Sequence, residues 1–436
     1  MKVSFFGFVV ILLMMIVCKG MHRGEDSSDS DEPGKAVSNC EELDFDDMMA
    51  SIENFIEEDP EFINELFGKE YLTRNRDLKI SYETTKWGKL LNNPRTQFPW
   101  TKEGKQFRQD FRVPEPVFRH IVEKCKEGHV FGDPTETRGV RVPVEYKVLM
   151  ALRILGRGNC AADIADMSDG KPTSITGFFH RFVLGFSQRF FNEYVHPPEG
   201  AALQRTLDSY AALGLPGAIG SMNCTHIAWD KCPIEFTNLC KGKEKYPSVA
   251  FNCVVDHFRF IHWCSDAYFG ATNDIQICGD DEYTLAVRGG LYKNVEYYLY
   301  RAGLHENIRQ RCRGAYLICD AGMPKEGCFM DPQHHRSTRN EVLFAEWLES
   351  VRKDVECTFG ILKARFRYLR NKVQHHSMDI IEGAMKVCCM IHNMILVYDG
   401  EALTDLTNSY HLLTPVSYLC RTNWLKKPFS APDHRS

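Results

Sequence analysis

The 436-residue sequence lacks an excess of positive charge. Its 53 lysines and arginines stand against 58 aspartates and glutamates, which gives a net charge of -5. A chain that binds nucleic acid over its whole surface is usually basic, so any such surface here must be a local basic patch. The contents of 44% hydrophobic and 25% charged residues are those of an ordinary soluble globular protein.

The sequence also lacks the cysteine spacing of a zinc site or of a disulfide-rich domain. Its 17 cysteines are odd in number and scattered along the chain. Disulfide frameworks are denser and occur in shorter secreted chains, and structural zinc sites need four closely spaced ligands. Neither Cys232 with Cys240 nor Cys388 with Cys389 belongs to such a set. We therefore expect most of the thiols to be reduced core side chains.

No internal repeat of 20–50 residues is visible, which argues against solenoids and propellers. The apolar run Phe5–Cys18 is short for a membrane span and follows a lysine at position 2. Residues 1–20 therefore resemble a secretory leader, and the alternative is an unused leader with the true start at Met21. Residues 21–70 form an acidic arm, whose first part is typical of disordered segments.

Residues 107–198 carry mostly helical patterns. A short helix at 161–167 and a turn at 168–170 precede a longer helix, whose predicted N-cap is Thr173 or Ser174. This is the layout of a helix-turn-helix, whose second helix can enter the DNA major groove, but a packing subdomain shows the same spacing. The candidate DNA contacts on the second helix are His180 and Arg181.

Residues 215–395 change to strands alternating with helices. The strand patterns are PGAIGSM before Asn223, Ser248–Asp256 with its return strand at 259–270, and Gly314–Asp320. The helix patterns are Glu341–Arg370 and Asp379–Val397. The first helix has an apolar stripe at helical spacing: Phe344, Trp347, Leu348, Val351, Val355, Phe359, Leu362 and Phe366. The sequence predicts an α/β fold with a mixed sheet, preceded by a mostly helical domain.

Three positions of the α/β region form the pattern of a metal site. Position 223 and Asp320 are predicted to end strands, and Glu356 lies at the border of the helix stripe. Strand ends are where α/β sheets bind ligands, and Mg²⁺ and Mn²⁺ prefer such hard oxygen donors. Each acid also has an ordinary alternative, because Glu356 lies on a helix rich in cations and an aspartate after a strand is often a turn residue. The spacing alone does not identify a nuclease.

The second half of the chain contains a series of blocks in a fixed order: GSMNCTHI, WDKCP, KGKEKYPSVAFNCVVD, GATNDI, YLICDAGMP, RKDVECTFGILKARFRYL and CCMIHNM. Over residues 215–397 these blocks resemble the DDE transposase domain of the PIF/Harbinger superfamily, in particular its plant-transposon-type branch and the nuclease-like proteins derived from it. Residues 107–198 resemble the helix-turn-helix segment that precedes that domain. The resemblance implies an RNase H-like fold, three catalytic acids, Mg²⁺ or Mn²⁺, and hydrolysis or strand transfer at DNA phosphodiesters.

Carried over by position, the resemblance assigns the second and third acids to Asp320 and Glu356. The first acid falls on Asn223, where the family pattern has aspartate. Asparagine keeps the shape but removes one anionic ligand, so it cannot offset the repulsion between two nearby dications. We therefore expect Asn223, Asp320 and Glu356 to form the catalytic and metal-binding set, with weak or no strand cleavage. The alternative is a non-catalytic relative that acts as a DNA-binding or protein-interaction factor.

Neighbouring side chains are auxiliary candidates at this site. Asp256 ends a core strand and Asp274 lies in the ATND turn, so either is a candidate replacement for the missing ligand, as is Asp230. His226 follows Asn223 by three residues and is a candidate phosphate or metal contact. The ordinary alternative for His226 is a structural hydrogen bond near the strand end.

A basic run with interleaved aromatic residues, KARFRYLRNK, follows Glu356. Cations beside a metal site would neutralise DNA phosphates, although a solvated charged surface is the alternative. The nucleic-acid contacts predicted in this run are Lys363, Arg365, Arg367 and Arg370.

The resemblance implies DNA as a partner and a nuclear location, and it is compatible with a Myb-like protein partner and with a homo-oligomer. No membrane association is expected, whereas a functional leader at 1–20 would direct the chain to the secretory route. Residues 398–436 are interpreted as a C-terminal tail.

Overall fold

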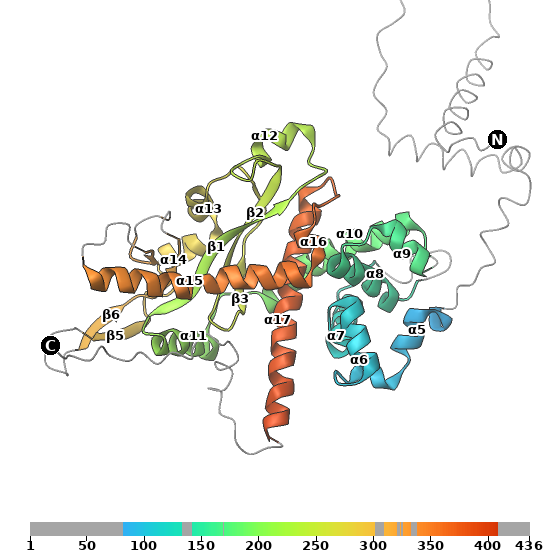
Figure 1. Ribbon diagram of the computed structural model, residues 1–436, viewed down its shortest axis with the longest axis horizontal. Coiled ribbons are helices and arrows are strands. Elements are labelled where there is room, and N and C mark those ends of the chain that lie inside the picture. Colours follow the sequence, from blue (N-terminus) through green and yellow to red (C-terminus); the bar gives the residue numbers. More distant parts are fainter. Residues whose placement is uncertain are drawn as a thin grey trace, which may run out of the picture. The chain divides into compact units, whose positions relative to one another are not determined.

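Helices form the first part of the described chain, and a sheet with covering helices forms the second part (Figure 1). The computed structural model describes residues 82–132, 142–168, 170–300, 309–320, 323, 326–332 and 338–408, and all of them fall within one compact unit. The leader at 1–20, the acidic arm at 21–70 and most of the predicted C-terminal tail lie outside the described residues.

The helices that precede the sheet are α5 (Lys86–Leu91), α6 (Lys102–Phe111), α7 (Glu115–Glu127), α8 (Val144–Arg157), α9 (Ala161–Ser168), α10 (Pro172–Tyr194) and α11 (Gly200–Ala212). Two short 3-10 turns, Tyr82–Thr84 and Pro94–Gln97, flank α5. The pair α9 and α10 matches the two predicted helices, but α10 begins at Pro172 and its cap position is Lys171, not Thr173 or Ser174. Proline has a fixed φ and no N–H, so it begins a helix without a side-chain cap.

A mixed sheet forms the centre of the second part, which confirms the predicted α/β class. Its strands are β1 (Ala218–Ala228), β2 (Ser248–Val255), β3 (Ile261–Cys264), β4 (Tyr268–Phe269), β7 (Tyr316–Ile318) and β8 (Phe329–Met330). Their order is β3-β2-β1-β7-β8, with β4 also paired to β2. Strand β1 runs antiparallel to β2 and parallel to β7. Strands β5 (Glu296–Tyr300) and β6 (Arg309–Arg313) form a separate antiparallel pair.

Strand β1 is longer than predicted and does not end at Asn223. It continues to Ala228, with Asn223 opposite Cys253 and Ala228 opposite Ser248. Every residue of β2 is buried, so the central pairing holds β1 in place beyond the point where its apolar pattern stops. Asn223 therefore lies inside a central strand.

The long helix after the sheet ends earlier than predicted. Helix α15 spans Arg339–Arg365 and begins with a capping box between Thr338 and Glu341. The backbone of Phe366 is extended and its ring is fully buried, and the short α16 (Arg367–Arg370) follows and packs against α8. The break keeps the Phe366 ring in the core while the chain turns. The last helix, α17, spans Met378–Asn408 and exceeds the predicted range at its C-terminal end.

The predicted apolar stripe of α15 is buried only in its later turns. Phe344 and Trp347 are 48% and 41% exposed, whereas the stripe from Leu348 to Phe366 is buried. The helical period thus identified the inward face, but it did not show how much of the helix the sheet covers.

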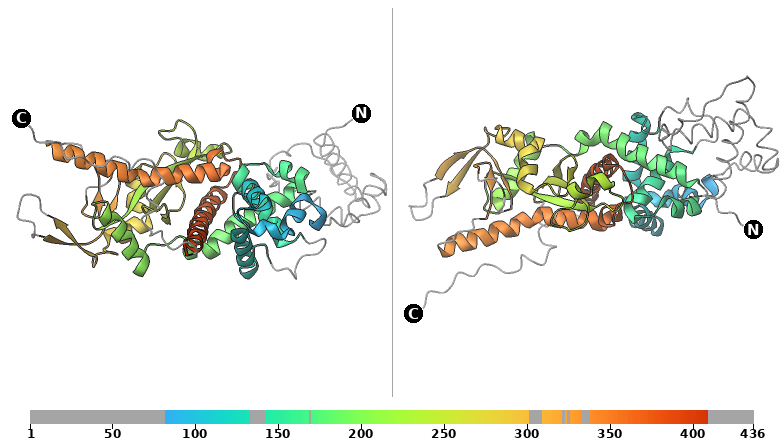
Figure 2. Two further views of the ribbon diagram at one scale, coloured as in Figure 1. Left: turned by 60° about the horizontal axis from the view of Figure 1, so that its bottom comes forward. Right: turned by 90° about the horizontal axis from the view of Figure 1, so that it is seen from above.

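Helices cover both faces of the sheet (Figure 2). On one face, Leu348 and Val351 of α15 pack with Ile318 of β7, and α11 joins them. On the other face, Met222 of β1 packs with residues of α13 (Asp274–Asp280) and α14 (Glu282–Arg288), such as Tyr283. The packing partners therefore show which face of the sheet each side chain of β1 occupies.

A larger apolar core joins the helices to the sheet. Its members come from α6 to α10, from β2 and β3, and from α15 and α17. Helix α17 packs along α10, so the predicted segments 107–198 and 215–397 share this core. The stretch Met378–Gly400 of α17 is long and apolar enough to cross a membrane, but 78% of its most apolar window is buried inside the protein. Core burial accounts for its composition.

Candidate functional site

Asn223 lies in β1, and Asp320 follows the adjacent parallel strand β7 by two residues. Ser221 of β1 lies opposite Ile318 of β7, and two residues further along, Asn223 comes beside Asp320 just beyond the end of β7. Ile318 packs with Leu348 of α15. Because side chains alternate along a strand, Asn223 and Asp320 both belong to the face that α15 covers.

Glu356 reaches the same region from α15. Its Oε1 lies 3.0 Å from Nη2 of Arg352, one helical turn earlier. Arg352 is only 6% exposed, and its pKa is raised by a hydrogen bond to Glu349 and by the charges of Glu356 and Asp320. A single guanidinium thus interacts with two of the three predicted site residues. Glu356 is therefore an ion-pair partner of Arg352, and Asp320 is close enough for its charge to act on the same guanidinium.

Asn223 places a neutral amide where the first acid is expected. The residue is half-buried, and its Oδ1 accepts a hydrogen bond from the backbone N–H of Cys224 at 2.8 Å. An amide oxygen can coordinate a hard cation, but it contributes no charge. The expected set therefore holds two carboxylates in place of three, and Arg352, whose guanidinium also donates two hydrogen bonds to Glu349, offsets part of their charge.

The donor set fits one weakly held cation better than a pair of metal ions. Asn223, Asp320 and Glu356 offer hard oxygen atoms, which suit Mg²⁺ or Mn²⁺. Two dications a few Å apart need more negative charge than two carboxylates beside an arginine provide. Within the described part of the chain, no three His, Cys, Asp or Glu side chains are arranged to hold a metal ion.

Asp256 does not face the Asn223 position. Its side chain is buried, its Oδ1 accepts the N–H groups of Phe258 and Phe260 at 2.9 Å, and its Oδ2 lies 3.3 Å from Nε2 of His262. These bonds hold the turn between β2 and β3. Asp256 is thus committed to the turn and is not a spare metal ligand.

Asp274 lies on the opposite face of the sheet, in the first turn of α13. Burial and then the charge of Asp274 raise the pKa of the Cys224 thiol, and Cys224 alternates with Asn223 along β1. The Asp274 carboxylate is 3.5 Å from the ammonium group of Lys243. Asp230 lies beyond the end of β1 and accepts a hydrogen bond from Gln374. The structure does not bring either acid to the Asn223 side chain.

His226 shares the Cys224 side of β1. Its Nδ1 is 3.2 Å from the Ser248 hydroxyl oxygen, and its buried Nε2 has no hydrogen-bond partner in the protein. Burial, followed by the charge of Lys243, lowers the pKa of the imidazole, so it is neutral at pH 7. This arrangement matches the structural alternative for His226, away from the face that carries Asn223.

Sequence reasoning missed Asp354, the buried acid of α15. Its Oδ2 lies 2.7 Å from Nδ1 of His257, and its Oδ1 pairs with Nη1 of Arg259. Two residues in a helix differ by about 200°, so Asp354 faces inward while Glu356 faces outward. The pairs fasten α15 to the turn after β2 and so fix the helix that carries Glu356. The available signal was its position beside Val355 on the apolar stripe.

The predicted basic run divides into inward and outward cations. The Lys363 ammonium donates to the His226 carbonyl at 3.0 Å, and burial lowers its pKa. Arg365 approaches Nδ1 of His392 at 3.0 Å, and burial lowers its pKa to about 10. Arg367 and Arg370 are exposed. Only this second pair is presented to a partner in solution.

On α10, the two predicted DNA contacts also differ. Arg181 is exposed, whereas His180 is half-buried and its ring centroid lies 5.1 Å from that of His375. The Nε2 atom of His180 is buried without a hydrogen-bond partner. The opposite side of α10 is covered by α8, α9 and α17. Arg181 is therefore the residue of the two that is available for contact.

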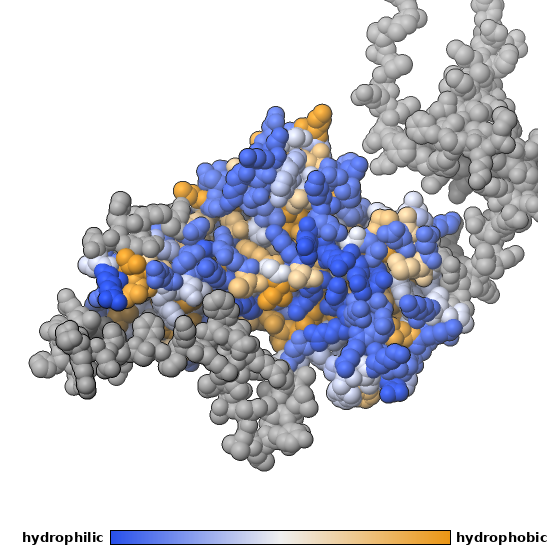
Figure 3. Space-filling view, in the orientation of Figure 1, coloured by the Kyte–Doolittle hydropathy of each residue, from blue (hydrophilic) through white to orange (hydrophobic). Residues whose placement is uncertain are grey.

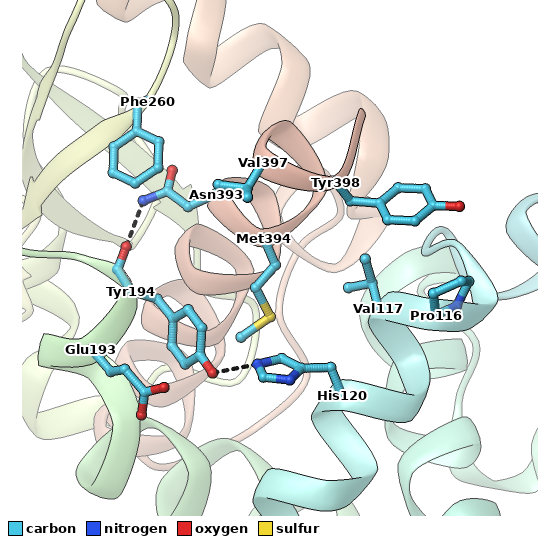
Figure 4. A pocket seen from close by; sticks show the side chains of 10 residues that line it. All are labelled: Pro116, Val117, His120, Glu193, Tyr194, Phe260, Asn393, Met394, Val397 and Tyr398. Carbon is cyan, nitrogen blue, oxygen red and sulfur yellow. Dashed lines mark hydrogen bonds between the residues drawn. The ribbon is translucent and has the colours of Figure 1, made fainter. Parts of the chain in front are cut away.

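A pocket of about 400 Å³ lies apart from the acids, between α7, α10 and α17 (Figure 4). Its lining includes Val117 and Met394, and the Tyr194 hydroxyl is 2.6 Å from Nε2 of His120. Glu193 is its acidic residue. An apolar pocket with an acid does not suit a phosphodiester, and none of Asn223, Asp320 and Glu356 lines it.

Comparison with known proteins finds a family model that matches part of the sequence. Residues 192–403 match the family model described as plant transposon protein. Over these residues the chain is similar to the plant transposon proteins. The match includes β1, β7 and α15, the elements that position Asn223, Asp320 and Glu356. The resemblance inferred from the sequence blocks is confirmed.

Curated relatives cover more of the chain than the family match does. Protein ALP1-like of Arabidopsis thaliana is 22% identical over 306 residues, 69% of this chain and 73% of its own length. Antagonist of like heterochromatin protein 1, from the same plant, is 21% identical over 74% of this chain and 80% of its own length. HARBI1 of Bos taurus, named as a candidate nuclease, is 21% identical over 66% of this chain and 76% of its own length. No solved structure is detectably similar.

Proposed function

We propose that the protein is a transposase-derived, nuclease-like protein that acts on DNA phosphodiesters with Mg²⁺ or Mn²⁺, and that its cleavage step is weak or lost. The observation that carries the proposal is the position of Asn223 beside Asp320, on the face covered by the helix of Glu356. The family match supports the transposase origin. The neutral side chain at the first acid position supports the impairment.

The chain's own residues support a definite division of roles. Asp320 and Glu356 would hold a divalent cation, with the Asn223 amide oxygen as a third donor, and the cation would supply Lewis-acid activation of a phosphodiester. Exposed Arg367 and Arg370 would neutralise DNA phosphates close to α15. The pair of Asp354 and Arg259 would keep α15 in register with the sheet.

The finer fold assignment belongs to the same proposal. An RNase H-like core is supported by a sheet in which two parallel strands and one covering helix bring the site residues together. A helix-turn-helix role for α9 and α10 is supported by their order and by the exposed Arg181. The packing of α10 on α17 equally fits the alternative of a helical subdomain.

A second candidate function is a non-catalytic factor that binds DNA or another protein. The ion pair between Arg352 and Glu356 favours it, because an internal cation occupies charge that a metal would need. One relative is named as an antagonist of a heterochromatin protein, which supports a role through binding. Nuclear location, a Myb-like partner and self-association remain proposals under either function.

The deciding experiment is a plasmid-nicking assay of the full chain with Mg²⁺ or Mn²⁺, for the wild type and for Asn223→Asp. Nicking by the variant alone supports an impaired nuclease. Nicking by neither protein, with both folded and bound to DNA, supports the binding factor. Nicking by the wild type that Asp320→Ala abolishes would overturn the impairment, because the two carboxylates would then suffice.

A further inference from the structure

A cluster of arginines lies outside the acid site, around the end of α8, which contacts both α6 and α16. Its centre is Arg157 at the end of α8, in the sequence Gly156-Arg157-Gly158. Of the arginines in this cluster, the proposed function involves only Arg367.

The two glycines bring an arginine to each side of Arg157. A Cβ atom at Gly156 would lie 2.7 Å from Cγ of Arg112, and a Cβ atom at Gly158 would lie 3.5 Å from Cβ of Arg367. Gly158 also has a φ of +66°, which ends α8 in the left-handed region. The stems of Arg112 and Arg367 therefore pack on the backbone that flanks Arg157.

The cluster has little internal compensation. Arg153 and Arg157 share one acid, Asp110, with nitrogen–oxygen distances of 3.2 and 3.7 Å. Arg157 also donates a hydrogen bond to the Gln109 carbonyl at 2.9 Å, and it thereby supplies a partner for a carbonyl group in the last turn of α6. No acid in the described part of the chain forms an ion pair with Arg112 or Arg367. The Nε atoms of Arg112 and Arg157 are buried without a hydrogen-bond partner.

The pKa of Arg157 also indicates that the positive charges of the cluster are poorly compensated. Burial and then the charges of Arg112 and Arg153 lower the pKa of Arg157, and Arg367 adds to this effect. Such repulsion is relieved when an anion binds between the guanidinium groups. Exposed Arg370 and Lys372 extend the positive charge along the chain. Figure 3 shows hydrophilic residues gathered where α16 meets the helical first part of the protein.

We propose that Arg112, Arg157 and Arg367 bind a phosphate of the DNA backbone and form a second DNA contact beyond the acid site. The inference rests on the proposed function, because the ligand is the DNA on which the acid face would act. At 1.5 Å per residue, the end of α15 lies roughly 14 Å beyond Glu356, which corresponds to about four base pairs of duplex. Guanidinium groups suit a phosphate because they donate two parallel hydrogen bonds.

The test measures binding of a fluorescein-labelled 20-base-pair duplex by the full chain over a range of salt concentrations. The variant Arg112→Gln/Arg367→Gln is expected to bind at least about tenfold more weakly at low salt, with a salt slope smaller by about one, because the contact to one phosphate is lost. The matched control is Arg205→Gln/Arg313→Gln, which removes the same charge from α11 and β6. The control should change the slope by less than half as much.

Equal affinity and slope for the two double variants would overturn the inference, as would absence of duplex binding by the folded wild type. If Arg112→Gln/Arg367→Gln does not fold, Arg367→Gln alone serves, because Arg367 is exposed. Nicking by Asn223→Asp separates the two ideas. Active Asn223→Asp with no effect of the arginines retains cleavage by the acid site, but it removes this site and the phosphate contact proposed for Arg367. Inactive Asn223→Asp with weakened binding by the arginine variant retains this site and removes the cleavage function.

Discussion

Nη2 of Arg352 lies 3.0 Å from Oε1 of Glu356, across one turn of α15. Arg352 is nearly buried and also interacts with the charge of Asp320, so a fixed cation lies among the carboxylates of the candidate site. The positive charge of Arg352 weakens the attraction of these carboxylates for a metal cation. Arg352 and Asn223 thus both weaken the affinity of the candidate site for a metal cation.

Arg352→Met in the Asn223→Asp background should strengthen Mn²⁺ binding by roughly tenfold, which is about 1.4 kcal/mol. Methionine replaces the apolar stem of the arginine side chain and removes the charge that opposes the metal. Titration calorimetry with Mn²⁺ measures the change. Lys353→Met is the control, because Lys353 is an exposed cation on the same helix. Unchanged Mn²⁺ affinity after Arg352→Met would show that the guanidinium does not compete with metal.

Asp274 should not contribute to any cleavage that Asn223→Asp restores. Asp320→Asn, added to Asn223→Asp, is expected to reduce nicking by at least about a hundredfold, because it removes a metal ligand. Asp274→Asn in the same background should leave the rate within about twofold, because Asp274 lies on the opposite face of the sheet. Equal losses from the two variants would mean that the acids share one site.

Arg259→Met should destabilise the fold by about 3–5 kcal/mol, because it leaves the buried carboxylate of Asp354 without its main partner. Urea unfolding followed by circular dichroism measures the loss. Arg259→Met/Asp354→Leu should recover most of it, since the charge itself is then absent. A double variant as unstable as the single one would contradict the ion-pair explanation.

Stability should fall as the pH drops from about 6.5 to about 4. Burial lowers the pKa of His375 to about 4, and burial with the charge of Arg365 lowers that of His392 to about 4. Below pH 6.5 the unfolded chain takes up protons that the folded chain does not, so each histidine destabilises the fold progressively, by up to roughly 3 kcal/mol for His392. Unfolding in urea at a series of pH values tests this. His392→Gln should flatten the profile, whereas His196→Gln, at an exposed position, should leave its shape unchanged.

The sequence supported more of the fold than of the site. The helical period located the inward face of α15 through Leu348 and Val355, and apolar runs located β2 and β7, because these patterns are local consequences of burial. The end of β1 could not be read from the chain, since pairing with β2 extends it past Asn223 to Ala228. The break at Phe366 was equally hidden, because the residues around it retain a helical period.

By itself, the sequence determined which residue types are available: an amide at position 223, carboxylates at Asp320 and Glu356, and cations along 363–372. The tertiary structure alone decided which of them face the same point. Strand alternation separates Asn223 from Cys224 and Asp274, and α15 turns Asp354 inward and Glu356 outward. The tertiary structure also turns Lys363 and Arg365 inward, and it brings together Arg112, Arg157 and Arg367 from distant segments of the chain. Charge in a sequence is additive, whereas its effect depends on distance and burial, which only packing fixes.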